Sequence, residues 1–224
     1  MTDDGSRTLL DSDSSLAWHS ESGALAESQH VYLDNSGVGQ RLQEGRKTNV
    51  LEIGFGTGLC FWLTASAACH GDAQLDYTSF EYRLLPAVVL AELKHGEIKK
   101  CQPAYDLFFP SVFDAAGLTD GQLSCQVGSV SLKLVTRDVN ESPELPSQLD
   151  AVFHDPFSPE ATPEMWSEEL FSRLFAQLKP NGKLVTYCVK SSIQRLLGQI
   201  GFEVAKQKGP PGGKREVLVA TRPG

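Results

Sequence analysis

The stretch Asn49-Val-Leu-Glu-Ile-Gly-Phe-Gly-Thr-Gly-Leu59 joins a short apolar run to three glycines in alternate positions. The apolar run predicts a buried strand, and Cys60-Phe-Trp-Leu-Thr-Ala-Ser-Ala-Ala68 predicts a helix after the glycines. Glycine has no Cβ, so a backbone built from it turns sharply and approaches a ligand closely. We therefore expect a strand, a tight turn and a helix, the unit that opens many nucleotide-binding α/β folds.

Strand and helix patterns alternate along the rest of the chain. Further strands are predicted over 76–81, 127–137, 149–155, 183–189, 202–206 and 215–220, and helices over 85–93, 164–178 and 191–201. A short helix and a turn are expected between Leu16 and Leu42, Pro180-Asn-Gly predicts a turn, and 99–121 shows no regular pattern. Strands that alternate with helices form a mostly parallel sheet with helices on both faces. The sequence thus predicts a doubly wound, Rossmann-like α/β fold with an antiparallel C-terminal edge.

The size and composition of the chain indicate one folded domain. Its 224 residues are enough for one α/β domain and few for two. We expect a disordered leader over 1–14, which is rich in Asp and Ser, and a single domain over 15–224. No run of eighteen apolar residues exists, which argues against a membrane-spanning helix. The five cysteines are scattered and form no C-x-x-C pair, which favours reduced thiols in the cytoplasm and no metal site.

The glycine turn predicts the cofactor. In doubly wound sheets, ligands bind beyond the carboxyl ends of the strands, where the strand order reverses. The first such end carries Glu52, followed by Gly54, Gly56 and Gly58. A dinucleotide site prefers the spacing G-x-G-x-x-G, whereas this spacing is G-x-G-x-G with an acid two residues upstream. A carboxylate there is poorly suited to pyrophosphate but suits the cationic amino acid end of S-adenosylmethionine, which we predict as the cofactor.

Two further strand ends carry acids that suit the same cofactor. Glu81 can accept hydrogen bonds from both ribose hydroxyls, as acids do in nucleotide-binding folds, or it is a surface acid at a strand end. Asp138 can meet the adenine amino group, or it only caps the turn before Asn140-Glu-Ser-Pro.

The fourth strand end, Phe153-His-Asp-Pro-Phe-Ser-Pro159, predicts the place of the chemistry. Transfer of a methyl group to an amine needs a neutral nitrogen, and Asp155 can hold that amine and take its proton. The ring of Phe157 can stack on a flat substrate base. The alternative is a rigid turn, set by two prolines, that only borders the cofactor. His154 points to the opposite face of a regular strand from Asp155 and is expected to be packed.

These motifs together resemble the MnmC/MnmD methyltransferase family, which makes 5-methylaminomethyl-2-thiouridine at the wobble position of bacterial tRNA. The resemblance rests on Val50–Leu59, Phe80-Glu81, Phe153–Pro159 and Pro163-Glu-Met-Trp166. It extends to His19–Glu27 near the N-terminus and to Gly201-Phe, Lys208-Gly and Gly213-Lys-Arg-Glu216 near the C-terminus. It covers about residues 18–221, nearly the whole predicted domain.

The resemblance implies methyl transfer from S-adenosylmethionine to the aminomethyl nitrogen of a modified wobble uridine. Glu52, the three glycines, Glu81, Asp138 and Asp155 would then form the cofactor pocket, with Asp155 beside the accepting amine and Phe157 in the base pocket. Lys206, Lys208, Lys214 and Arg215 would contact tRNA. Some members of the family carry a fused flavin-dependent oxidase. This chain has no room for one, so we expect a stand-alone transferase without FAD that uses an amine made by separate enzymes.

Other functions remain open from the sequence. The net charge of −8 counts against a nucleic-acid partner, because phosphate contacts usually need a basic face. It suits a methyltransferase of the same fold that acts on a small amine or a protein. A nicotinamide-dependent oxidoreductase is disfavoured by the glycine spacing, and a non-enzymatic binding module by the acids at four strand ends.

Overall fold

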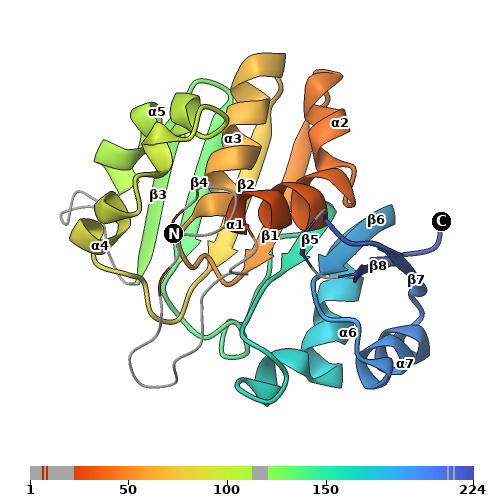
Figure 1. Cartoon of the computed structure of the whole chain (residues 1–224). Helices are drawn as coiled ribbons and strands as arrows, with labels where there is room; N and C mark the ends of the chain where they lie inside the picture. The colour runs from red at the N-terminus through yellow and green to blue at the C-terminus, as the bar shows by residue number, and fades with distance from the viewer. Residues whose placement is uncertain (1–6, 8, 10–22, 113–120, 211, 214) are drawn as a thin grey trace.

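The computed structural model describes residues 7, 9, 23–112, 121–210, 212–213 and 215–224, and within these its centre is one mixed sheet (Figure 1). The strands lie in the order β3-β4-β2-β1-β5-β6-β8-β7. Their bounds are β1 Thr48–Ile53, β2 Leu75–Phe80, β3 Gln122–Val127, β4 Val130–Val135, β5 Leu149–His154, β6 Leu178–Thr186, β7 Glu203–Lys208 and β8 Glu216–Thr221. Strands β4, β2, β1, β5 and β6 are parallel, and the order reverses between β1 and β5.

Helices cover both faces of this sheet (Figure 1). Their bounds are α1 Ala24–Glu27, the π-helix η1 Ser28–Asp34, α2 Val38–Gln43, α3 Leu59–Gly71, α4 Ala87–Glu92, the 3₁₀ turn η2 His95–Glu97, α5 Gln102–Val112, the 3₁₀ turn η4 Pro163–Trp166, α6 Glu168–Gln177 and α7 Ser191–Ile200. Side chains of a strand alternate between faces, so Val50 joins the core under α3 while Leu51 joins the core under α6 and α7. Helix α3 is apolar on all sides because it packs between the sheet, α2 and α5.

The predicted fold class is confirmed. The parallel sheet and the antiparallel pair β7–β8 lie where the sequence pattern placed them, with bounds that differ by a few residues, and β3 adds a strand that pairs antiparallel with β4. The closing pair is not a simple appendage, because β8 inserts between β6 and β7 and only β7 forms the edge. No helix in the described part of the chain is long and apolar enough to cross a membrane.

Three local predictions are wrong. Residues 102–112 form helix α5 in the stretch predicted to be irregular, because burial of Ala104 and Phe108 against α3 outweighs the presence of Pro110. The predicted helix over 164–178 is two elements, since Ser167 is extended and caps α6 by accepting a hydrogen bond from the Leu170 N–H. The predicted turn at Pro180-Asn-Gly lies inside β6, where the pairing with β5 is irregular and Asn181 has a φ of 63°. Of the expected leader over 1–14, only residues 7 and 9 are among those described.

Asp150 fixes β5 at the end of the sheet opposite its carboxyl edge. Its buried carboxylate lies 2.8 Å from Arg41 Nη2 and 2.9 Å from Lys179 Nζ, and it accepts the Asn49 N–H at 2.8 Å. These partners come from α2, β6 and β1, so one side chain ties β5 to both neighbouring strands and to a covering helix.

The turn after β1 comes into direct contact with the end of β5. The Gly54 N–H donates to the Phe80 carbonyl at 2.9 Å, and the Asp155 N–H donates to the Ile53 carbonyl at 3.0 Å. A Cβ on Gly54 would lie 2.6 Å from the Asp155 carbonyl oxygen, and the φ of Gly54 is +93°. Position 54 therefore lacks room for any side chain.

We expect Gly54→Ala to destabilise the protein more than Gly128→Ala does. Gly128 also has a positive φ, of +57°, but a Cβ there would meet nothing within 4 Å. Gly128→Ala should therefore lower the free energy of unfolding by about 1–2 kcal/mol, through backbone strain alone. Gly54→Ala should lose roughly 1–3 kcal/mol more, through the clash with β5. Urea unfolding measures both values, and equal losses would show that the contact with Asp155 does not constrain position 54.

Candidate functional site

The glycine turn forms the base of the candidate site, at the point where the strand order reverses. Gly54, Gly56 and Gly58 all have positive φ, of 93°, 54° and 77°. Gly58 is the N-cap of α3, and a Cβ there would lie 2.8 Å from Phe55 Cζ and 2.9 Å from Trp62 Nε1. The turn therefore keeps its backbone bare and directs the N-terminus of α3 toward the carboxyl edge of the sheet.

Glu52 lies beneath this turn on β1 and is 1% exposed. It is paired in register with Ser79 of β2, whose hydroxyl donates to the Glu52 carboxylate at 2.7 Å. Burial raises the pKa of Glu52 well above its usual range, and the nearby charges of Asp155 and Glu81 add to the rise, while the Ser79 hydroxyl opposes it. A bound cation stabilises the ionised form of such a buried carboxylate.

Glu81 connects the end of β2 to the glycine turn. Its carboxylate accepts the Gly56 N–H at 2.9 Å and the Arg83 N–H at 2.9 Å, one on each oxygen. Burial raises the pKa of Glu81, and these backbone donors oppose the rise. Each oxygen keeps a second lone pair that can accept a ligand hydroxyl.

Asp138 lies in the loop after β4. One of its oxygens accepts the Asn140 N–H at 2.8 Å and the Asn140 side-chain amide at 3.1 Å. The structure thus shows Asp138 capping the turn, as one of the two interpretations expects. Within the described residues, its other carboxylate oxygen has no hydrogen bond.

Asp155 receives a hydrogen bond from a residue that the strand-end pattern does not reveal. The hydroxyl of Tyr32, on the π-helix η1, donates to the Asp155 carboxylate. The Tyr32 side chain is 2% exposed, and its ring lies 5.6 Å from that of Phe153, centroid to centroid. Burial raises the pKa of Tyr32 well above its usual value, and the charge of Asp155 raises it further, so the hydroxyl stays protonated as a donor. π-Helical turns are rare and occur frequently at functional sites.

Three acidic side chains from separate elements lie around the thiol of Cys60. Glu27 at the end of α1 is 8% exposed, and it joins Glu52 and Asp155 in acting on the thiol of Cys60 at the start of α3. Burial is the largest cause of the raised pKa of Cys60, and all three carboxylates add to it. In the sequence, Glu27 stands out only as the last residue of the His19–Glu27 motif, because no predicted strand ends near it.

The loop after Asp155 is held in place by contacts to its backbone. The Tyr187 hydroxyl donates to the Pro156 carbonyl at 2.9 Å, and Trp166 Nε1 donates to the Phe157 carbonyl at 2.9 Å. The Phe157 side chain is 38% exposed. His154 is fully buried against Trp166 and Phe171, and burial lowers its pKa to about 3, so it is neutral and packed as predicted.

Of the predicted tRNA-contacting cations within the described residues, Lys206 and Lys208 lie on β7, and Arg215 comes directly before β8. Lys206 Nζ pairs with Glu216 at 2.9 Å across the hairpin. The carbonyl of Lys208 lies 2.7 Å from His30 Nε2, two residues before Tyr32 on η1. Arg215 is exposed, and Lys214 lies outside the described residues. The hairpin therefore adjoins the element that contacts Asp155, and among its described cations Lys206 is compensated by Glu216.

Comparison with known proteins adds a family assignment. Residues 94–223, more than half of the chain, match the model of a family described as S-adenosyl-L-methionine-dependent methyltransferase. The chain is 33% identical over 210 residues to the tRNA 5-methylaminomethyl-2-thiouridine biosynthesis bifunctional protein MnmC of Cupriavidus necator, and 34% identical over 210 residues to that of Cupriavidus metallidurans. Each alignment covers 91% of this chain but 31% of the relative, so the chain spans about a third of the length of these relatives.

A solved structure supports the fold. The crystal structure of MnmC2 from Aquifex aeolicus superposes with a TM-score of 0.79 and 24% identity, over all of this chain and 70% of that one. The fold is shared at this level, and the family match runs from residue 94, before η2, to residue 223, after β8. The chain belongs to the family of S-adenosyl-L-methionine-dependent methyltransferases.

Proposed function

We propose that this methyltransferase modifies the aminomethyl group of a wobble uridine in tRNA, in the synthesis of 5-methylaminomethyl-2-thiouridine. The proposal takes 15–224 as one methyltransferase domain in the cytoplasm, with tRNA as its partner and a different active site as the source of the amine. The observation that carries it is the hydrogen-bonded carboxylate of Asp155 beside buried Glu52, at the reversal of strand order. The relatives whose names describe this tRNA modification support the choice of substrate.

The residues of the site fit S-adenosylmethionine. The raised pKa of Glu52 and the negative charge around Cys60 both favour a ligand with an ammonium or sulfonium group. Glu52 and the bare glycine turn would hold the amino acid end, Glu81 the ribose hydroxyls and Asp138 the adenine amino group. Bound S-adenosylmethionine supplies an electrophilic methyl group to the site.

Asp155 would hold the acceptor amine and take its proton. Tyr32 donates to one carboxylate oxygen of Asp155 and so orients the carboxylate. Asp155 would accept the proton that the acceptor nitrogen loses when it takes up the methyl group. Phe157 would stack on the uridine ring, and its exposure on a loop fixed by Trp166 and Tyr187 supports this role.

A second candidate is methyl transfer to a small amine or a protein. The net charge of −8 and the pairing of Lys206 with Glu216 favour a substrate that carries few phosphates. The carboxylates that hold an amine would serve either substrate.

Transfer of labelled methyl from S-adenosylmethionine to tRNA that lacks its final wobble methyl group tests the proposal. The wild type should label this tRNA, and Asp155→Asn should lower kcat by about 10²–10⁴-fold because the proton acceptor is lost. Binding of S-adenosylmethionine by this variant should change much less. Glu169→Gln, an exposed acid on α6, is the control and should keep full activity. Labelling of small amines or proteins but not tRNA would select the second candidate, and full activity of Asp155→Asn would remove the catalytic role.

The raised pKa of Glu52 predicts a pH dependence of stability. The folded pKa lies above the unfolded one, so the contribution of Glu52 is fully present below the unfolded pKa and is lost as the pH rises through the folded pKa. Glu52→Gln removes this loss. Without cofactor, the variant should therefore gain stability relative to the wild type as the pH is raised from about 5 to about 8.

Urea unfolding of the wild type and of Glu52→Gln across this pH range gives the difference between their free energies of unfolding. The contributions of the other titrating groups cancel in this difference. Affinity for S-adenosylmethionine should show the opposite trend in the wild type, rising with pH as Glu52 ionises, and should be weak at every pH in Glu52→Gln. A stability difference that does not vary with pH would mean that folding does not raise the pKa of Glu52.

A further inference from the structure

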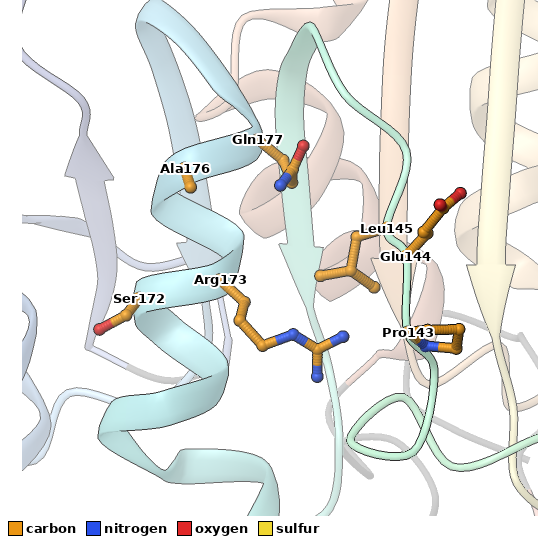
Figure 2. A pocket seen from close by; sticks show the side chains of 7 residues that line it. All are labelled: Pro143, Glu144, Leu145, Ser172, Arg173, Ala176 and Gln177. Atoms are coloured by element: carbon orange, nitrogen blue, oxygen red, sulfur yellow. The ribbon is translucent and has the colours of Figure 1, made fainter.

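Arg173 of α6 is tied to the loop that follows β4. Its guanidinium donates to the carbonyls of Val139 at 3.2 Å and Asn140 at 3.3 Å, and also to that of Ser142. Figure 2 shows the side chain reaching from α6 toward the segment Pro143–Leu145, across an open groove that these residues line with Ser172, Ala176 and Gln177. The described residues that line the groove include no buried, unpartnered polar group that would indicate a ligand. The role of Arg173 is therefore to hold the loop that follows β4.

This loop carries Asp138 and has no regular secondary structure. Its form comes from two turn hydrogen bonds, Glu141 N–H to the Asp138 carbonyl at 3.1 Å and Ser142 N–H to the Val139 carbonyl at 3.3 Å. Asn140 is the link between Arg173 and Asp138. Its carbonyl is held by Arg173, while its N–H and its side-chain amide both donate to the Asp138 carboxylate.

A guanidinium suits this task in a way that an ammonium does not. It presents five N–H donors in a rigid plane, so one side chain can reach three carbonyls that point in different directions. The carbonyls belong to residues on both sides of Asn140, which fixes the orientation of the turn as well as its position.

We propose that Arg173 is a positioning residue that orients Asp138 through Asn140 and thereby makes the site selective for adenine. The proposal rests on the proposed cofactor role of Asp138. The free carboxylate oxygen of Asp138 accepts a hydrogen bond from an exocyclic amino group but repels the carbonyl oxygen that replaces it in hypoxanthine. Selectivity between these two bases therefore depends on where the carboxylate is held.

The test compares the affinities of S-adenosylhomocysteine and its inosine counterpart by calorimetry. The wild type should prefer the adenine ligand by about tenfold or more, the effect of one hydrogen bond to a charged group. Arg173→Met should lower this preference to within about twofold, mainly by weakening the adenine ligand. Arg173→Lys should recover part of it, and Ser172→Ala, on the same helix and groove, should leave it unchanged.

The preference ratio separates positioning from general structural support. If Arg173→Met weakens both ligands equally, or keeps the wild-type ratio, the proposal is overturned. Asn140→Ala removes the side-chain link without altering α6, so it decides the matter if Arg173→Met does not fold: a reduced ratio supports the proposal and an unchanged ratio overturns it. Failure of the wild type to bind S-adenosylhomocysteine at all would instead overturn the proposed function.

Discussion

The contact between the bare backbone of Gly54 and the carbonyl of Asp155 is the constraint on which the rest of the site depends. Where the connections after two neighbouring parallel strands go to opposite faces of the sheet, a crevice normally opens between them. Here the turn after β1 passes directly over the end of β5, so that crevice has a floor of backbone atoms. Because Glu52 and Asp155 project from these two strands on the same face, the constraint also sets their carboxylates near each other.

Placing several carboxylates together in a buried region opposes folding, since each loses hydration and repels the others. The apolar layer beneath them offsets this penalty. Tyr77 and Phe153 pack against Phe61 and Tyr32 under α3 and η1, and all four rings are buried. Carboxylates that destabilise one another in the absence of a ligand, and that are held on a packed apolar layer, are suited to bind a cation strongly without rearrangement.

Much of the fold could be predicted from the sequence because its signals are local. The strand, glycine turn and helix at 49–68 and the acids that end four strands are each visible within about ten residues. Tyr32 could not be found in this way, since it lies 123 positions from Asp155 and meets it only through the packing of η1 on the sheet. Helix α5 was not predicted, because its apolar periodicity is weak and Pro110 argues against a helix. The packing of α5 on α3 stabilises the helix only in the folded protein. The pairing of Lys206 with Glu216 depends on the register of a hairpin, which the sequence does not specify. The site roles of Glu52, Glu81, Asp138, Asp155 and Phe157 remain predictions that their observed positions support.

The hydrogen bond between His30 and the carbonyl of Lys208 has a consequence for biosynthesis. It joins η1, at residues 28–34, to β7, at residues 203–208, and β8 must insert between β6 and β7 before that hairpin is complete. Contacts of such long sequence separation form late in folding. The nascent chain can therefore build most of its parallel sheet during translation. The contact that supports η1, and with it the position of Tyr32 beside Asp155, forms only after the β7–β8 hairpin has been synthesised.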